Sequence, residues 1–570
     1  MNDLIIRGGT VIDGTGSPAR TADVAIRDGR IRAIGRIDES ARRELDADGL
    51  LVTPGWVDIH THYDGQATWD PYLSPSSWHG VTTAVMGNCG VGLAPARPEQ
   101  RDWMIELMEG VEDIPGAVLH EGVRWTWESF PEYMTALERM PRAVDIGTQI
   151  PHGALRVYVM GDRGVRREPA TSSDLATMGR LAREAVEAGA LGFSSSRTIV
   201  HKTSRGESVP SLDVSSTEYQ AIGRELGRSG RGVIQLISDF GDIDSEFQLI
   251  RDVAAASGRP VSFSLLQNDF YPGRWRELLA RTAQARADGL RIRAQVGCRP
   301  IGLLLGLQCS LNPFIGRAAY QAIAHLPFEE RLSRMRTPEL RAAILDEAPQ
   351  PMTQRLDHIT GSFYKLFPLG DPPDYEPAPD SSIAARASRE GRPAQELAYD
   401  LLLEKGGREL LYFPLYNYSD SDLEAVREMM THSDTVLGLS DGGAHCGYIC
   451  DVSYPTYLLT HWGRDRSRGG RLPLEFLVRA QARATAEALG LEDRGLLAPG
   501  MKADVNLIDF ENLKLAPPEI ANDLPAGGRR LVQRATGYVA TIVAGEVIME
   551  SGAPTGAMPG RLVRGMKGIQ

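Results

Sequence analysis

The sequence predicts an α/β fold in which eight parallel strands alternate with helices and close into a TIM (β/α)8 barrel. Apolar segments of strand length recur through the middle of the chain, and amphipathic segments such as residues 174–187 separate them. Alternation of this kind requires a parallel sheet with helical crossovers, and eight such units form a barrel. A doubly wound open sheet is the alternative, but no Gly-x-Gly-x-x-Gly loop follows the first strand candidate. The eight strand candidates span residues 52–60, 80–89, 145–153, 189–197, 232–239, 260–268, 292–300 and 435–441.

The two ends of the chain share a different pattern. Residues 1–50 and 491–570 contain short apolar runs separated by glycine-containing turns, which is typical of antiparallel strands. We therefore expect both ends to combine into one small β-sandwich beside a barrel of residues 51–490. Residues 305–415 interrupt the strand–helix rhythm, and we interpret them as an insertion over the barrel mouth, either a lid or surface decoration.

Composition limits the class of protein and its partners. The chain has 570 residues, more than one hydrophobic core usually holds, with 62 basic and 74 acidic residues and a net charge of -12. The acidic balance argues against nucleic acid and anionic membranes and favours a small-molecule substrate. No secretory leader and no apolar window of about 18 residues is evident, so a cytoplasmic protein is expected. Five scattered cysteines also suit a reducing compartment.

A metal site is predicted at the end of the first barrel strand. His60 and His62 close the apolar run "VTPGWVDIHTHYDG", and residues two apart on a strand share one face. Two imidazoles at the carboxyl end of a barrel strand can bind one divalent metal. Cys89 ends the second strand candidate, where a thiolate would be a strong zinc ligand. The alternatives are two partly exposed histidines and a buried structural thiol.

Asp441 follows the eighth strand candidate, so it shares the barrel end with His60 and His62. An aspartate there can ligate a metal and accept a proton from an attacking water. The alternative is an aspartate that starts a turn before Gly442 and Gly443.

Substrate contacts are expected from cationic side chains near the other strand ends. Arg197 and Arg299 could each grip a carboxylate through two hydrogen bonds, although barrel mouths also use arginines to build loops. His201 and Lys202 could complete a metal shell or bind a carboxylate, with solvated loop residues as the alternative, and His445 is a nearby candidate.

The motifs together resemble a known family. The segments "PGWVDIHTHYDG", "GVTTAVMGNCGVGLAP", "PHGALRVYVMG" and "SDGGAH" are similar to those of the amidohydrolase superfamily, and within it to the N-acyl-D-amino-acid deacylases, or D-aminoacylases. The segments "LGLEDRGLLAPGMKADVNLIDF" and "TGAMPGRLVRG" extend the likeness to the C-terminal end. The resemblance implies a metal-dependent barrel beside a terminal β-sandwich. It implies a hydrolase that uses metal-activated water to split an N-acyl amino acid into a carboxylic acid and an amino acid.

One departure from the family pattern concerns the second metal. Family members carry a histidine at the end of the fifth strand and another at the sixth, whereas this chain offers Gln235 and the segment 264–267. The resemblance therefore implies one zinc per chain, held by His60, His62, Cys89 and Asp441, and an impaired second position. A hydrolase of cyclic amides or imides and a silent barrel that only binds a small ligand are the alternatives, and a homo-oligomer is compatible with either.

Overall fold

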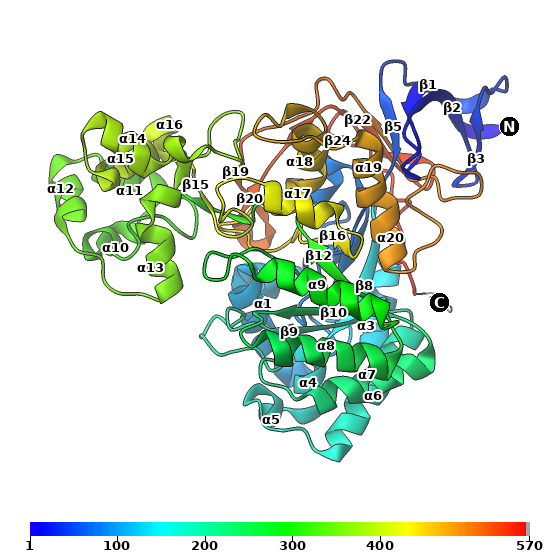
Figure 1. Ribbon diagram of the computed structural model, residues 1–570, viewed down its shortest axis with the longest axis horizontal. Helices are drawn as coiled ribbons and strands as arrows, with labels where there is room; N and C mark the ends of the chain where they lie inside the picture. The colour runs from blue at the N-terminus through cyan, green and yellow to red at the C-terminus, as the bar shows by residue number, and fades with distance from the viewer. Residues whose placement is uncertain (566–570) are drawn as a thin grey trace.

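The computed structural model describes residues 1–565, and an eight-stranded parallel sheet forms its centre (Figure 1). Each of the eight strand candidates contains one of these strands, so the predicted α/β fold with a curled, TIM-like parallel sheet is confirmed. In chain order the strands are β6 (Trp56–Asp58), β7 (Val81–Met86), β8 (Asp145–Pro151), β9 (Gly192–Arg197), β10 (Val233–Ser238), β11 (Val261–Ser264), β12 (Ile292–Val296) and β16 (Thr435–Leu437).

Backbone contacts just beyond β6 and β16 join the two edges of the curled sheet. The amide of Asp441 donates to the carbonyl of His60 at 3.1 Å, and the amide of His62 donates to the carbonyl of Gly442 at 2.8 Å. A parallel bridge also pairs Thr61 with Gly442. Closure therefore places the residues that follow the first strand directly beside those that follow the eighth.

Helices cover the outside of the curled sheet and carry the chain from one strand to the next (Figure 1). The third crossover is typical: a capping box between Thr171 and Asp174 starts its helix, whose apolar face buries Met178, Ala182 and Val186. The crossover helices are α1 (Arg101–Glu112), α2 (Gly116–Gly122), α3 (Phe130–Arg139), α4 (His152–Met160), α5 (Asp162–Val165), α6 (Ser172–Glu187), α7 (Ser216–Ser229), α8 (Ile243–Ser257), α9 (Arg274–Ala287) and α17 (Glu424–Thr431). After β16 come α18 (Tyr454–Tyr457), α19 (Leu474–Arg479) and α20 (Thr485–Ala488).

Both ends of the chain contribute to one nine-stranded sheet. Antiparallel pairing of β5 with β17 joins the N-terminal strands to the C-terminal ones, and apolar side chains from both ends, such as Ile6, Val52, Val505 and Ile542, share one core. The strands are β1 (Asn2–Val11), β2 (Arg20–Arg27), β3 (Arg30–Gly35), β4 (Ala41–Asp46), β5 (Leu51–Pro54), β17 (Val505–Ile508), β22 (Tyr538–Val543), β23 (Glu546–Glu550) and β24 (Ala553–Pro554). This sheet therefore continues through β5 before the chain enters the barrel. Four more strands, in two pairs, complete the C-terminal region: β18 (Lys514–Leu515) pairs with β21 (Ala535–Thr536), and β19 (Glu519–Leu524) forms a hairpin with β20 (Gly528–Val532).

A buried charge cluster ties the barrel to the C-terminal segment. Asp145, at the start of β8, forms two ion pairs through one carboxylate oxygen. This oxygen lies 2.7 Å from Nη1 of Arg494 and 2.9 Å from Nζ of Lys502. The Asp145 and Arg494 side chains are almost fully buried, and Lys502 is mostly buried. Burial alone raises the pKa of Asp145, but Lys502 and Arg494 outweigh it and lower the pKa below its ordinary value. The aspartate therefore stays ionised and contributes stability that disappears only as the pH falls through its lowered pKa.

Replacing Asp145 by asparagine is expected to destabilise the protein by about 3 kcal/mol, because two buried cations lose their shared counter-charge. The measurement is the shift in the urea unfolding midpoint at neutral pH. Glu138→Gln is the matched control, since Glu138 meets Arg564 at an exposed site where an ion pair contributes about 0.5 kcal/mol. Equal midpoints for the two variants would contradict a tethering role for Asp145.

Residues 302–414, between β12 and β16, form a helical lobe with a core of its own. The chain enters the lobe through β13 (Gly302–Leu305) and leaves it through β15 (Leu411–Pro414), and these two strands pair antiparallel. The strand β14 (Phe367–Pro368) pairs with the other edge of β15 and completes a small sheet. Its helices lie to one side of the barrel helices α6–α9 (Figure 1). They are α10 (Ala318–Ala324), α11 (Phe328–Met335), α12 (Pro338–Asp346), α13 (Gln354–Gly361), α14 (Ile383–Glu390), α15 (Ala394–Leu402) and α16 (Glu404–Gly407). Lys365 of this lobe contacts both carboxylate oxygens of Asp269, in the loop after β11, at 2.6 Å. The lobe therefore touches the end of the barrel where the strands finish.

Within residues 1–565, no helix combines the length and the apolar character needed to cross a lipid bilayer.

Candidate functional site

Four predicted residues from three strand ends converge at the carboxyl end of the barrel. Ligand atoms of His60, His62 and Cys89 all lie within 4.8 Å of one another. The Nε2 atom of His60 is 3.2 Å from Cys89 Sγ and 3.5 Å from an Asp441 carboxylate oxygen, which is 3.6 Å from His62 Nε2. Four ligands around a tetrahedral zinc lie about 3.3–3.8 Å apart, given zinc–nitrogen and zinc–sulfur bonds of about 2.0–2.3 Å. The spacing of these atoms fits one such ion.

The backbone at this site adopts a conformation that ordinary residues avoid. Cys89, Asp441 and His445 have φ angles of 54°, 48° and 53°, in the left-handed region. Non-glycine residues there cost of order 1 kcal/mol each and persist where the surrounding structure demands them. Both left-handed residues, Cys89 and Asp441, place a side-chain atom within 3.5 Å of His60 Nε2.

Negative charge accumulates around the two histidines. Burial alone lowers the pKa of His60, but Cys89 and Asp441 outweigh it and raise the pKa to about 9. Burial raises the pKa of Cys89, yet the two imidazoles outweigh it and lower that pKa, and the pKa of Asp441 is likewise lowered by His62 and His60 despite burial. The site is therefore a buried set of anionic donors, thiolate and carboxylate, that a divalent cation would neutralise.

Two side chains that the sequence analysis missed orient the histidines. Gln295, on β12, places its Oε1 atom 2.6 Å from His60 Nδ1. Glu112, the last residue of α1, places a carboxylate oxygen 3.0 Å from His62 Nδ1 and is buried. The acceptor on Gln295 fixes the proton at Nδ1 of His60 and leaves its Nε2 free to face a metal, while Glu112 contacts His62 as a close ion pair. The sequence held one weak sign of a role for Glu112. An acidic residue at the C-terminus of a helix is unfavourable beside the negative end of the helix dipole, so its presence there indicates another partner.

Replacing Glu112 by glutamine is expected to weaken metal binding by about 10- to 100-fold, as loss of a partner that orients a metal-binding histidine usually does. Competition with a chromogenic chelator measures this affinity directly. Asp102→Asn is the matched control, an exposed acidic residue on the same helix. Unchanged affinity in the Glu112 variant would mean that the carboxylate does not orient His62.

Three consecutive serines on β9 hold the surrounding loops. Ser194 accepts a hydrogen bond from the amide of Gly90 at 2.9 Å, which fixes the turn that carries Cys89. Ser196 lies 3.0 Å from Nδ1 of His201. Because side chains two apart point to one face, Ser194 and Ser196 both face the interior of the barrel, while Ser195 bonds to His152 outside it at 2.8 Å.

The fifth and sixth strands offer neutral oxygen and nitrogen atoms, from Gln235 within β10 and from Ser264 at the end of β11. Gln235 accepts a hydrogen bond from the amide of Cys89 at 2.7 Å, and its Nε2 atom is buried without a partner in the described part of the chain. Ser264 is buried with its hydroxyl likewise unpaired among residues 1–565. Neither side chain is a usual zinc ligand.

His201 and His445 flank the four converging residues. Burial lowers the pKa of His201 to about 4, so this imidazole is neutral at pH 7. The charges of Glu112, His62 and Asp441 also act on this pKa. The amide of His445 donates to the carbonyl of Glu112, and the charge of His445 lowers the pKa of Asp441. Both histidines are therefore close to the acidic groups of the site.

The remaining predicted residues lie in different surroundings. Arg197 makes two hydrogen bonds of 2.7 Å to Glu246, and Lys202 is exposed. Arg299 is buried: its Nη2 atom donates to the Cys450 carbonyl at 2.7 Å and to Asp451 at 3.1 Å. The Nε and Nη1 atoms of Arg299 have no hydrogen-bond partner among the described residues. Arg299 thus retains donors for a ligand, whereas those of Arg197 are engaged by Glu246.

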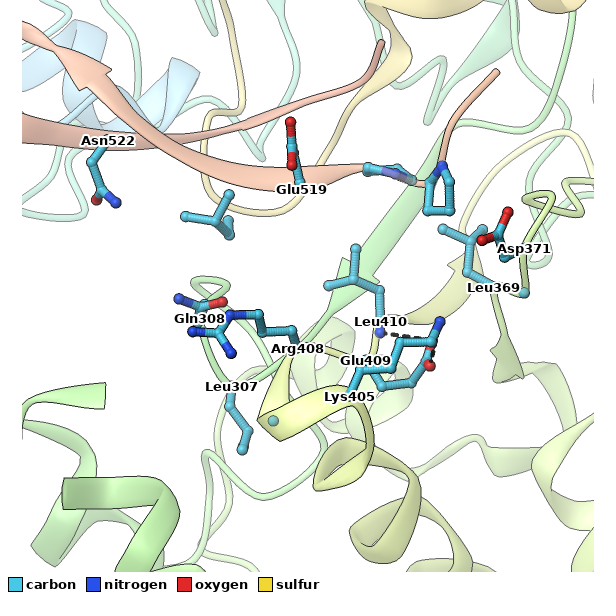
Figure 2. A pocket seen from close by; sticks show the side chains of 15 residues that line it. Leu307, Gln308, Leu369, Asp371, Lys405, Arg408, Glu409, Leu410, Glu519 and Asn522 are labelled. Atoms are coloured by element: carbon cyan, nitrogen blue, oxygen red, sulfur yellow. Dashed lines mark hydrogen bonds and ion pairs between the residues drawn. The ribbon is translucent and has the colours of Figure 1, made fainter. Parts of the chain in front are cut away.

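A separate cavity of about 460 Å³ lies between the helical lobe and the β19–β20 hairpin (Figure 2). Its walls include Gln308 and Leu410 from the lobe and Glu519 and Asn522 from the hairpin. Lys405 and Glu409 point toward each other there, 2.7 Å apart. None of the four converging residues lines it, so this cavity is distinct from the candidate metal site.

Comparison with known proteins defines the class. The model of the amidohydrolase family matches residues 43–549, and the chain belongs to that family. D-aminoacylase of Alcaligenes xylosoxydans xylosoxydans is 28% identical over 98% of this chain and 97% of its own. A crystal structure of D-aminoacylase, described as defining a novel subset of amidohydrolases, is 25% identical with a TM-score of 0.65 and covers 99% of this chain and 100% of its own. An N-acyl-D-glutamate deacylase from Bordetella bronchiseptica, solved with zinc and a phosphonate inhibitor, shares the fold at 22% identity and a TM-score of 0.64, covering 99% of each chain.

Family membership and these relatives make the chain a hydrolase that acts on carbon–nitrogen bonds of small molecules. The resemblance to D-aminoacylases that the motifs indicated is confirmed.

Proposed function

We propose that the protein is a zinc-dependent deacylase that hydrolyses N-acyl D-amino acids to a carboxylic acid and a free amino acid. The observation that carries the proposal is the convergence of His60, His62, Cys89 and Asp441 at tetrahedral spacing. The full-length likeness to D-aminoacylase supports the choice of substrate class.

His60, His62 and Cys89 would hold the ion, and Asp441 would leave the fourth position to the attacking water while it serves as the base. Bound zinc makes water more acidic and polarises a carbonyl group. With Gln235 and Ser264 where further ligands would be needed, the proposal is for one zinc per chain.

Asp441 acts as the general base in this proposal. Its pKa is lowered, so the carboxylate is ionised at neutral pH and able to accept a proton from the attacking water. The protonated carboxyl then returns that proton to the departing amide nitrogen, which leaves as the amine of the amino acid.

Arg299 is the candidate for the substrate carboxylate. Two of its nitrogen atoms are unpaired within residues 1–565, and its guanidinium lies 3.6 Å from the ring centre of Tyr375, which restricts its orientation. A buried guanidinium that meets a carboxylate through two nitrogens fixes the orientation of the amino acid and thereby its handedness.

The test combines metal content with a substrate panel. Protein purified without chelator is assayed for bound metals, and for release of amino acid from matched N-acetyl D- and L-amino acids. About one zinc per chain with turnover confined to D-isomers would support the proposal. Turnover only of cyclic amides, or of L-isomers, would contradict it.

A further inference from the structure

Five exposed apolar side chains form a rim along the barrel mouth. Among the described residues, seven large apolar side chains are exposed, and all but Met1 and Met558 lie in loops after β9 and β11 or in the helical lobe. We call these five residues the apolar rim: Ile199 (64% exposed), Val200 (42%), Phe270 (62%), Tyr271 (53%) and Tyr364 (63%).

Polar contacts connect the neighbouring loops that carry the rim. The amide of Ile199 donates to Asp239, in the loop after β10, at 2.8 Å. In the next residue of that loop, the carbonyl of Phe240 accepts from Arg274 at 2.6 Å, and this guanidinium lies 3.7 Å from the ring centre of Tyr271.

These contacts continue from the barrel into the lobe. Asp269, beside Phe270, pairs with Lys365, beside Tyr364, and the ring of Phe270 lies 6.1 Å from that of His358. Because Asp239, Arg274, Asp269 and Lys365 are all engaged by neighbours, the surface between them is suited to an uncharged group.

One end of the rim is next to the barrel interior along the chain. Val200 immediately precedes His201, whose Nδ1 atom lies 3.0 Å from the hydroxyl of Ser196 on β9. A substrate bound at the site would therefore meet the rim with whichever part extends out of the barrel.

We infer that the rim binds the acyl chain of the substrate, and that the enzyme prefers long aliphatic N-acyl groups over acetyl. This inference rests on the proposed deacylase function. The amino-acid half of such a substrate carries a carboxylate, which an apolar surface would disfavour, whereas the acyl half is neutral. Exposed apolar surface beside a catalytic site is a common mark of ligand binding.

The experiment is a chain-length series on one amino acid that the enzyme accepts. The probes are its N-acetyl, N-hexanoyl and N-decanoyl derivatives, used below their micelle-forming concentrations. Each methylene buried on the rim should raise kcat/KM about fourfold, so three buried methylenes give about a sixtyfold gain. The double variant Phe270→Ser, Tyr271→Ser should lose most of this gain and keep its activity on the N-acetyl compound.

Met558→Ser is the matched control, since Met558 is exposed and apolar but belongs to the C-terminal segment, and it should retain the full chain-length gain. A flat series in the wild-type enzyme would overturn the inference while leaving the deacylase proposal intact. A gain that follows the amino-acid side chain instead of the acyl chain would also overturn it. So would a double variant that changes only the oligomeric state in size-exclusion chromatography, because the rim would then be a contact between copies. Absence of turnover on every N-acyl amino acid would instead refute the deacylase proposal itself.

Discussion

Replacing Asp441 by asparagine is expected to lower kcat by about a thousandfold or more, within the range by which a positioned base accelerates hydrolysis. Asparagine keeps the shape of the side chain but accepts no proton at neutral pH. It also tolerates the left-handed backbone that Asp441 adopts, with φ 48°, so the fold should persist.

Two measurements separate the base role from a structural one. The unfolding midpoint and the zinc content of the variant should match those of the wild type, because His60, His62 and Cys89 stay in place. Asp48→Asn, an exposed change in the terminal sheet, should leave kcat unaltered. Substantial residual turnover in the Asp441 variant would remove this residue from the base role, and loss of zinc would make it mainly a ligand.

Replacing Cys89 by serine is expected to weaken zinc binding by at least about a hundredfold, above the 10- to 100-fold effect of losing a partner that only orients a ligand. A neutral hydroxyl donates far less charge to zinc than a thiolate does. Equilibrium dialysis against a zinc buffer measures the loss without reference to activity.

Cobalt substitution provides a spectroscopic check on the same residue. The cobalt-loaded wild type should show thiolate-to-cobalt charge-transfer absorption, and the Cys89→Ser protein should lack it. Cys309→Ser is the matched control, because Cys309 lies in the helical lobe and burial raises its pKa to about 12. Charge-transfer absorption that survives in the Cys89 variant would exclude this thiol as a ligand.

The strands and their end residues could be predicted because parallel barrel strands are buried on both faces and therefore appear as apolar runs. The carboxyl ends of such strands meet at one end of the barrel, which is why His60, Cys89 and Asp441 could be grouped before the structure was known. Their convergence needed no information beyond strand order.

Contacts between side chains distant in sequence could not be predicted in the same way. Glu112 occupies the end of an ordinary amphipathic helix, and Gln295 is one of two polar residues in the short strand β12. Their roles depend on which ring nitrogen they approach, and neither periodicity nor composition encodes that distance. The internal sheet of the helical lobe was likewise missed, since β13 and β15 are more than a hundred residues apart along the chain.

The way the lobe is attached has a consequence for how such enzymes diversify. The chain leaves the barrel at Ile301 and returns at Leu415, whose amide donates to the Ile301 carbonyl at 2.9 Å. Because the exit and the return are closed against each other, lengthening or exchanging the segment between them adds little entropic cost to the barrel. We therefore expect the lobe to be exchangeable as a module, because its replacement would leave the strand ends that carry His60, Cys89 and Asp441 in place.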